Sequence, residues 1–334
     1  MKILVVGAGF AGATVAYELA KDGHDVVVID ERGHIGGNAY DYTNEHGIRI
    51  HRYGPHIFHT SNKKVYDWVT QFGDWVEYKH KVKAQLADGQ YVTLPVNRHT
   101  KEIVGEDNII DTFYRPYTKK MWGKELEELD PSITKRIPIR DDDNQLYFPN
   151  AKYQVMPKYG YTEIFNEILS EIPVHLNCSF KKEMEDDFDH VFNSMPIDVY
   201  YDYRFGELPY RSLKFYNIDL PMVRSLPTTV VNFTNDSPYT RITEWKNFPE
   251  HGSNDKLTTL TYEEPCDYRD NHYERYYPVK DINGENQKIY KTYKDIENPT
   301  VTFIGRCGMY VYIDMDQAVN SSLATVTRFK ESIK

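Results

Sequence analysis

Residues 2–31, KILVVGAGFAGATVAYELAKDGHDVVVIDE, decide the fold of the amino-terminal part of the chain. They begin with the apolar run from Lys2 to Val6, which is typical of a buried strand in a parallel sheet. Three glycines follow in the spacing G-x-G-x-x-G. Gly7 permits a tight turn, Gly9 lets backbone approach a pyrophosphate, and Gly12 allows close packing of helix on strand.

The residues after these glycines complete a βαβ unit. A helix is expected from Ala13 to Lys21, ended by Asp22-Gly23, and a second strand from Asp25 to Ile29. The strand ends in Asp30 and Glu31, and an acid at this place can accept hydrogen bonds from a ribose hydroxyl. Because the glycines lie between a strand and a helix and an acid follows, the pattern favours a dinucleotide site over a plain βαβ unit.

A second glycine pair follows the second strand. Gly36-Gly37 precedes Asn38 in the stretch RGHIGGNAY. Loop backbone at such a pair can contact phosphate. Two glycine-rich turns favour the longer FAD over an exchangeable nicotinamide dinucleotide, and a simple hairpin turn is the alternative.

The composition limits the class of protein. The length of 334 residues suggests two or three domains, and 40% hydrophobic with 27% charged residues is a globular composition. The net charge of −10 argues against a nucleic-acid partner. No apolar run approaches the ~20 residues of a membrane span, and the three cysteines are widely spaced. We therefore expect a cytoplasmic protein with neither nucleic acid nor membrane as a partner.

Three histidines, His51, His56 and His59, lie close together in IHRYGPHIFHT. Such a cluster raises the question of a metal site. The nearest carboxylates lie in no ligand-like pattern, and Pro55 breaks the helix that chelation at i, i+3 would need. We expect no metal here, although the residues alone leave that possibility open.

Several further stretches make the chain resemble one known family. They are HIGGNAY, IHRYGPHIFHTS, PYTKKMWG, KRIPIR, DYRFGELPYRSLKF, PYTRITEWK, RYYPV and YVYIDMDQAV. Taken in this order over nearly the whole chain, they resemble UDP-galactopyranose mutase. The FAD domain of that family is similar to that of the flavin amine oxidases, but its reaction is an isomerisation.

The resemblance implies an enzyme that interconverts the pyranose and furanose forms of a nucleoside-diphosphate sugar. In that family reduced FAD forms a covalent adduct between flavin N5 and the sugar, so that one difficult step becomes two easier ones. UDP-galactose is the default substrate, NAD(P)H the expected reductant, and galactofuranose for cell-surface polysaccharides the expected use. The sequence leaves open N-acetylgalactosamine or a 6-deoxy sugar, and thymidine in place of uridine.

Two other functions compete with the mutase. One is an FAD-dependent oxidoreductase of the amine-oxidase type, and the other is a catalytically silent flavin-binding protein with a docking surface. The paired arginines Arg136 and Arg241 favour the mutase, because an amine substrate has no use for two phosphate clamps.

The resemblance also implies which residues contact FAD. They are Gly7, Gly9, Ala11, Gly12, Asp30, Glu31, Gly37, Asn38, His56, Ile57, Arg306, Asp314 and Met315. In that family the HIFH loop packs along the flavin ring, so His56 and His59 would wall it, while His51 is expected to be structural. His59 is the candidate for keeping the reduced flavin competent. The start of the last helix, at Asp314, can stabilise negative charge on the reduced ring.

A sugar-nucleotide site is implied in the same way. The expected contacts with the base are Phe113 and Tyr117, and those with the sugar are Thr118 and Trp122. The expected contacts with the phosphates are Tyr147, Tyr277 and Tyr312. Arg136 and Arg241 match the diphosphate-facing arginines, and a guanidinium fork suits phosphate oxygens. Without the resemblance, Arg136 reads as a solvated charge and Arg241 as half of a cross-strand ion pair. Asn232 either touches the substrate or ends a strand.

The expected architecture is of the α/β class and has three domains. A Rossmann-like FAD-binding domain takes 1–78, 174–205 and 300–334; a helical domain takes 98–135, with a mobile loop to about 140; an antiparallel β-sheet domain takes 79–97, 141–173 and 206–299. One helix is expected over 101–129, with Ile109, Phe113, Tyr117 and Met121 on one stripe.

Two departures from the family have expected consequences. The stretch between LPVN and PYTKKMWG is several tens of residues shorter than usual, so the helical domain is trimmed and dimerisation through its usual surface is in doubt. A glycine pair of the family is Tyr159-Gly160 here, and we expect the tyrosine to reshape the flavin or sugar pocket.

Overall fold

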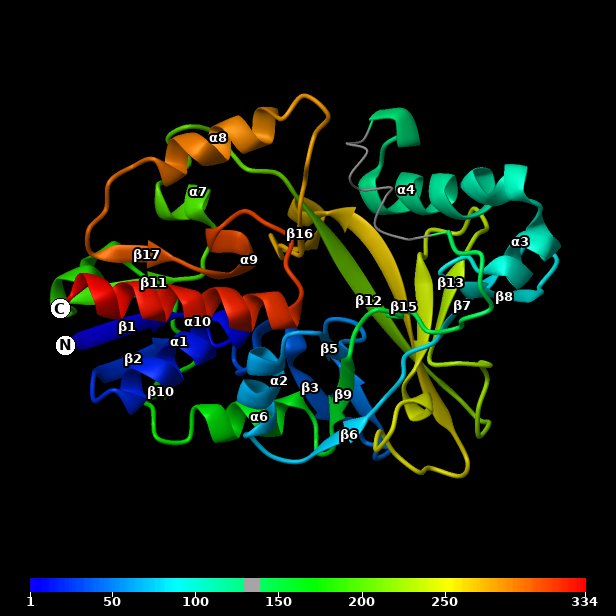
Figure 1. Ribbon diagram of the computed structural model, residues 1–334, viewed down its shortest axis with the longest axis horizontal. Coiled ribbons are helices and arrows are strands. Elements are labelled where there is room, and N and C mark those ends of the chain that lie inside the picture. Colours follow the sequence, from blue (N-terminus) through cyan, green and yellow to red (C-terminus); the bar gives the residue numbers. More distant parts are fainter. Residues whose placement is uncertain (129–138) are drawn as a thin grey trace.

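The computed structural model describes residues 1–128 and 139–334 of the chain. It has two lobes, one containing the two chain ends and the other built on the long strands β12 and β15 (Figure 1). The first lobe contains a five-stranded parallel sheet in the order β10-β2-β1-β11-β17. Its strands are β1 (Lys2–Val6), β2 (Asp25–Ile29), β10 (Val174–His175), β11 (His190–Asn193) and β17 (Val301–Phe303). The two predicted amino-terminal strands are therefore confirmed.

Two helices pack together beside this sheet (Figure 1). The first, α1 (Phe10–Lys21), starts three residues earlier than predicted, directly after its N-cap residue Gly9. The last helix, α10 (Met315–Ser332), begins directly after its N-cap Asp314, where its start was predicted. Gln317 Oε1 accepts a hydrogen bond from the Asp314 N–H at 2.9 Å, which fixes where α10 begins.

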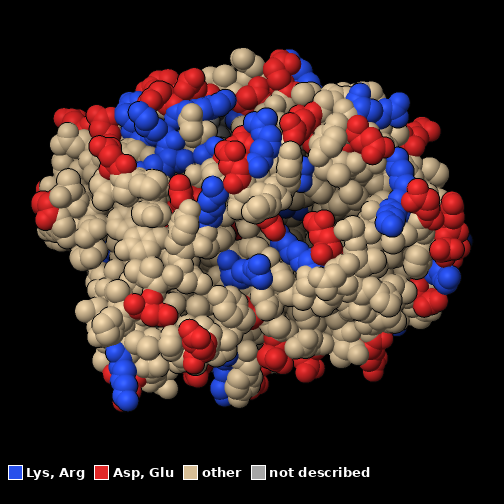
Figure 2. All heavy atoms as spheres, turned by 180° about the vertical axis from the view of Figure 1, so that it is seen from behind, with Lys and Arg blue, Asp and Glu red and all other residues tan. Residues whose placement is uncertain are grey.

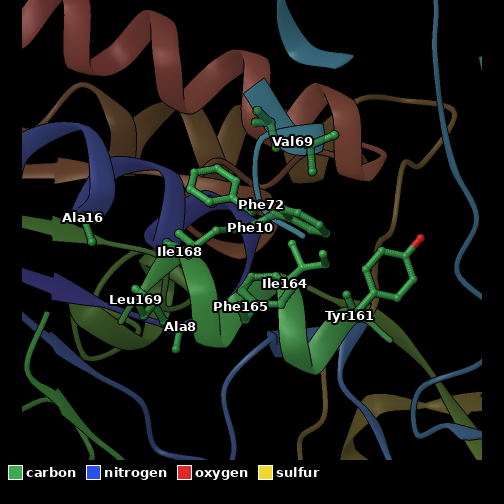
Figure 3. Close-up of a cluster of buried hydrophobic side chains, with 14 of the residues drawn as sticks. Ala8, Phe10, Ala16, Val69, Phe72, Tyr161, Ile164, Phe165, Ile168 and Leu169 are labelled. Atoms are coloured by element: carbon green, nitrogen blue, oxygen red, sulfur yellow. The ribbon is translucent and has the colours of Figure 1, made fainter. Parts of the chain in front are cut away.

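The predicted domain boundaries are wrong for one segment. Strand β9 (Tyr153–Pro157) pairs with β5 (Phe58–Thr60) and β6 (Trp75–Glu77), which belong to the first lobe. Helix α6 (Tyr161–Ile168) packs its apolar face into the same core as α1, and Figure 3 shows side chains of the two helices facing each other there. The Phe10 and Phe165 rings lie 4.7 Å apart. The segment 153–172 therefore packs with the FAD-binding domain.

The second lobe is a seven-stranded sheet in the order β16-β12-β15-β14-β13-β7-β8. Its strands are β7 (Val82–Gln85), β8 (Tyr91–Leu94), β12 (Tyr210–Leu220), β13 (Val230–Phe233), β14 (Arg241–Glu244), β15 (Thr258–Asp267) and β16 (Tyr277–Pro278). Neighbouring strands are antiparallel, except that β13 and β7 are parallel. Strands β7 and β8 form a hairpin around Asp88-Gly89, a dipeptide that favours such turns.

The predicted helix over 101–129 is broken into pieces. Helix α3 (Arg98–Val104) ends at Gly105, whose φ of +83° suits glycine, and a single π-helical turn η3 (Ile110–Tyr114) precedes α4 (Arg115–Trp122). Because the π turn shifts the helical register, the predicted stripe divides between two cores. Ile109 and Phe113 pack against β7, β8 and β13, whereas Met121 packs with Tyr53 and Leu213.

The remaining elements are short or lie around the two sheets. They are β3 (Asp41–Thr43), β4 (Arg49–His51), α2 (Lys63–Thr70), α7 (Ile197–Tyr200), α8 (Glu285–Lys294), α9 (Gly305–Gly308) and the 3-10 turns η1 (Gly37–Ala39), η2 (Glu106–Asn108), η4 (Leu126–Glu128), η5 (Lys182–Asp187), η6 (Trp245–Asn247) and η7 (Tyr268–Asn271). Among the residues that the structure describes, none of the helices has the length and hydrophobicity that crossing a bilayer requires.

Candidate active site

The two glycine-rich turns lie against each other. The Gly36 N–H donates to the Ala8 carbonyl at 2.9 Å, and a Cβ on Gly37 would lie 2.9 Å from the Gly9 Cα. At Gly12 a Cβ would lie 1.8 Å from the Gly7 carbonyl oxygen, so that helix α1 can approach β1 this closely only with glycine there. Within the described ranges, no side chain caps the amino terminus of α1. Its first N–H groups are therefore available to a pyrophosphate, and the cradle fits a dinucleotide such as FAD.

The acid at the end of β2 has a structural task as well. Asp30 is 8% exposed and accepts hydrogen bonds from the N–H groups of Ala8 at 2.7 Å and Arg32 at 2.9 Å. Each carboxylate oxygen keeps a second lone pair for a ribose hydroxyl. Glu31 is exposed. Asp30 is thus the ordered acid beside the first glycine turn.

A charged cluster that the sequence reasoning missed borders the second turn. Arg32 donates to the Asn38 side chain at 2.9 Å and forms an ion pair with Glu274. Its guanidinium lies 4.5 Å from the centre of the Tyr53 ring. The cluster connects the FAD-binding lobe to the loop before β16, and the local sequence around Arg32 contains no signal for its partner.

Figure 2 shows that charges of both signs are mixed over one face of the molecule, whereas nucleic-acid sites need one basic patch.

The two histidines expected beside the flavin lie in different surroundings. The His59 ring, in β5, stacks on Phe148 with centroids 3.6 Å apart, and burial lowers its pKa. His56 lies in the preceding loop, where burial, together with the nearby Arg306 and Arg241, lowers its pKa to about 4. Both rings are therefore neutral at pH 7. Ile57, between them, is in the first hydrophobic core.

Arg306 organises the carboxyl end of the chain at the site. It donates to the carbonyls of Tyr276 at 2.8 Å and Ile313 at 2.7 Å. Its guanidinium also lies 4.6 Å from the centre of the Tyr312 ring. Because Ile313 precedes the N-cap Asp314, Arg306 fixes the segment that leads into α10, and Met315 at the start of that helix packs against the first core.

Arg241 is held by a buried acid. Its Nε lies 2.7 Å from Oε2 of Glu263, which faces it across β14 and β15 and whose side chain is 1% exposed. Burial lowers the pKa of Arg241, but Glu263, together with Tyr277 and Tyr117, raises it overall, so the guanidinium stays charged. In the part of the chain that the structure describes, Glu263 Oε1 has no hydrogen-bond partner. The cross-strand ion pair is therefore real, and sequence reasoning missed its acid.

Tyrosines from four parts of the chain gather around Arg241. Burial raises the pKa of Tyr117, with contributions from Tyr277, Tyr147 and Glu263. The Tyr277 and Tyr312 rings stack with centroids 5.5 Å apart. Tyr147 also contacts His80 edge to face at 5.6 Å. The structure thus brings together five of the residues predicted for the substrate site, namely Arg241, Tyr117, Tyr147, Tyr277 and Tyr312.

Other predicted substrate residues are placed less directly. Asn232 on β13 pairs in register with Arg241, and Trp122 packs near Tyr277. Thr118 is 4% exposed. Phe113, predicted to contact the base, is 8% exposed and packs in the core under the sheet. Arg136 lies outside the described residues.

Two further findings concern residues near the site. His80, which sequence reasoning missed, is 4% exposed, and burial with Arg241 and His59 nearby lowers its pKa to about 3. A lone histidine between two strands carries no signal that distinguishes it from a core residue. The expectation that Tyr159 reshapes the pocket is wrong, because its side chain is 58% exposed beside Lys158.

These features define a flavoprotein class with an anionic substrate, since a dinucleotide cradle and a histidine loop lie beside a half-buried arginine that is surrounded by tyrosines. The family profile described as UDP-galactopyranose mutase matches residues 112–312, and the one described as an NAD(P)-binding Rossmann-like domain matches residues 5–72. The chain belongs to the UDP-galactopyranose mutase family. It is an FAD-dependent isomerase.

Individual relatives agree with this assignment. The chain is 35% identical to a probable UDP-galactopyranose mutase of Klebsiella pneumoniae, over 99% of this chain and 95% of the relative. It is also 35% identical to a dTDP-fucopyranose mutase of Escherichia coli, over 96% of each chain. A crystal structure of reduced UDP-galactopyranose mutase has the same fold, with a TM-score of 0.76 at 16% identity, covering 99% of this chain and 94% of that one.

Proposed function

We propose that the protein interconverts UDP-galactopyranose and UDP-galactofuranose, and that Arg241 and its surrounding tyrosines bind the diphosphate. The observation that carries this proposal is the Arg241–Glu263 pair, because a guanidinium fixed by a buried carboxylate is pre-oriented for phosphate oxygens. The similarity to a dTDP-fucopyranose mutase supports a thymidine-linked 6-deoxy sugar as the second candidate.

The chain's residues have three tasks in this reaction. Bound FAD, in its reduced form, supplies the nucleophile that displaces the diphosphate from the sugar. Arg241 neutralises charge that grows on the leaving diphosphate, and the hydroxyls of Tyr147, Tyr277 and Tyr312 donate to its oxygens. Arg136 is proposed as a second phosphate ligand on the strength of its motif alone.

The histidine loop orients and shields the reacting atoms. His59, stacked on Phe148, forms an apolar wall that excludes water. His56 stays neutral beside Arg241 and Arg306, so that no third cation competes for the diphosphate. Because both histidines are neutral, the positive charge that faces the leaving group comes from the arginines.

The remaining partner proposals concern the reductant and the dimer. NAD(P)H is the proposed reductant, and bleaching of the oxidised flavin absorbance on its addition tests this. Helices α3 and α4 pack on the sheet of the second lobe, and we propose that this short helical region does not support the usual dimer. Light scattering that gives the mass of a dimer in solution would contradict that proposal.

One assay tests the function. The purified flavoprotein is incubated with UDP-galactose, dTDP-fucose and UDP-N-acetylgalactosamine, with and without dithionite, and the furanose products are separated by chromatography. Furanose formed from UDP-galactose under reduction supports the proposal, and preference for the thymidine sugar selects the second candidate. Oxygen consumption with an amine, without isomerisation of any sugar, would contradict both.

A further inference from the structure

Two buried histidines from distant parts of the chain meet behind the histidine loop. His51, at the end of β4, and His251, which follows η6, are 200 residues apart in sequence. Each is 1% exposed, and their Nε2 atoms lie 3.0 Å apart. A hydrogen bond of this length needs a proton on one Nε2 and a lone pair on the other.

The contacts at the outer nitrogens decide which histidine donates. His251 Nδ1 lies 2.7 Å from the carbonyl oxygen of Pro249, so it carries the proton and leaves Nε2 as an acceptor. His51 Nδ1 accepts the backbone N–H of His56 at 3.1 Å, so the proton of His51 is on Nε2. The chain of hydrogen bonds therefore runs in one direction, from the His56 backbone through both imidazoles to a backbone carbonyl.

The same loop holds His56 in two further ways. Its Nδ1 lies 2.8 Å from the carbonyl oxygen of Gly54 and must donate to it. The hydroxyl of Tyr161 donates to the His56 carbonyl at 3.2 Å. The ring of His56 is therefore left with an unprotonated Nε2, on the loop that lies near Arg241 and Arg306.

The surroundings explain why a polar pair is buried here. The ring of His51 packs against Trp245, Phe248 and Tyr161, and apolar side chains could fill this space equally well. They would leave the buried N–H of His56 without an acceptor, which is costly. Burial keeps both imidazoles neutral, and the charge facing them, on Arg49, also disfavours their protonation.

We propose that His51 and His251 are positioning residues that hold the backbone at His56 in place. The ring of His56, whose tautomer is set by the Gly54 carbonyl, then presents a neutral acceptor to a donor of the bound cofactor or substrate. The proposal rests on the proposed function for the place of His56 beside the flavin. It assigns to His251, which lies in none of the stretches that carry the family resemblance, a role in the active site.

The test compares substitutions of His251 in the FAD-loaded protein. In His251→Gln the amide oxygen can still accept the His51 proton, whereas His251→Leu removes the acceptor. The readouts are the ¹⁵N shifts of the His56 ring in histidine-labelled protein, the absorbance bands of the bound flavin, and kcat and KM. His190→Leu is the matched control, since His190 is a buried histidine of the FAD-binding sheet, bonded to Thr302.

We expect His251→Leu to shift the His56 signals and the flavin bands, and to lower kcat by about 10- to 100-fold with a smaller change in KM. His251→Gln should resemble the wild type in every readout, and His190→Leu should leave the His56 signals unchanged. Unchanged His56 signals in His251→Leu, or equal defects in the Gln and Leu variants, would overturn the proposal.

A second pair keeps the proposal testable if His251→Leu does not fold. In His51→Asn the amide oxygen can replace Nδ1 as the acceptor for His56, whereas His51→Gln reaches only toward His251. We expect the His56 signals to be closer to wild type in the Asn variant than in the Gln variant. Signals closer to wild type in the Gln variant would refute the positioning role of His51. The spectra can be recorded without any sugar. A wild-type protein that isomerises none of the sugars would therefore contradict the proposed function, while the spectra would still test the positioning role of His51 and His251.

Discussion

Replacing Arg241 by alanine separates the structural role of this residue from its catalytic role. The substitution leaves Glu263, whose side chain is 1% exposed, without its cationic partner. Breaking a buried pair by removing one partner costs roughly 3–5 kcal/mol, and the partial exposure of Arg241 places the expected loss of unfolding free energy near about 3 kcal/mol. The loss in turnover has a different origin, namely the charge-assisted bond to the diphosphate.

That second loss can be estimated separately. A hydrogen bond to a charged group contributes roughly 1.5–3 kcal/mol, which corresponds to a fall in kcat/KM of about 10- to 150-fold. In the double variant with Glu263→Gln, the buried acid becomes neutral. We therefore expect the double variant to recover most of the unfolding free energy and none of the turnover.

The assay pairs urea denaturation of the FAD-loaded protein with isomerisation of UDP-galactose under dithionite. Bound flavin, measured by absorbance, shows that the variants compared are loaded equally. Near-normal turnover of the single variant would refute the diphosphate role. Recovery of turnover along with stability in the double variant would show that Arg241 acts only by supporting the fold.

Three other perturbations have definite outcomes. Gly37→Ala should lower FAD affinity far more than Gly47→Ala. Both positions have positive φ, but a Cβ at Gly37 would meet Gly9 in the facing turn, whereas a Cβ at Gly47 would have no described atom within 4 Å. The flavin retained on gel filtration measures this difference. Phe113→Ala should cost about 3–5 kcal/mol in urea denaturation without raising KM, whereas Tyr117→Phe should raise KM with stability unchanged. Burial lowers the pKa of His190 to about 4, so the unfolded chain binds its proton first and stability falls as pH drops below about 6.5. Between pH 7 and pH 5 this residue should account for a loss of about 2 kcal/mol, and parallel wild-type and His190→Gln stability curves would contradict that value.

Local patterns were sufficient for the dinucleotide-binding unit. The strands β1 and β2 follow directly from apolar runs. The glycine spacing determines the turn from β1 into α1, because each glycine is required by backbone that lies within a few residues of it. The hairpin of β7 and β8 and the start of α10 can also be predicted from the sequence, since their turn and capping signals are local. Motif order over nearly the whole chain then identified the family.

The helical region shows where local reading fails. The apolar stripe through Phe113 and Tyr117 has helical spacing, but one π turn shifts the register, so Phe113 enters a core and Tyr117 reaches the site. Periodicity reports that a face is apolar and does not report which neighbour will cover it. The place of α6 in the first core was missed for the same reason.

Local residue patterns were enough to identify the cofactor cradle and the family, whereas only folding establishes which polar groups meet. Arg241 finds Glu263 across two strands, and His51 finds His251 over a separation of 200 residues. A buried polar group needs a partner within hydrogen-bond distance, and the chain can supply that partner from any segment that folding brings near. For this reason no local pattern could name Glu263 or His251, although both are proposed to support the site.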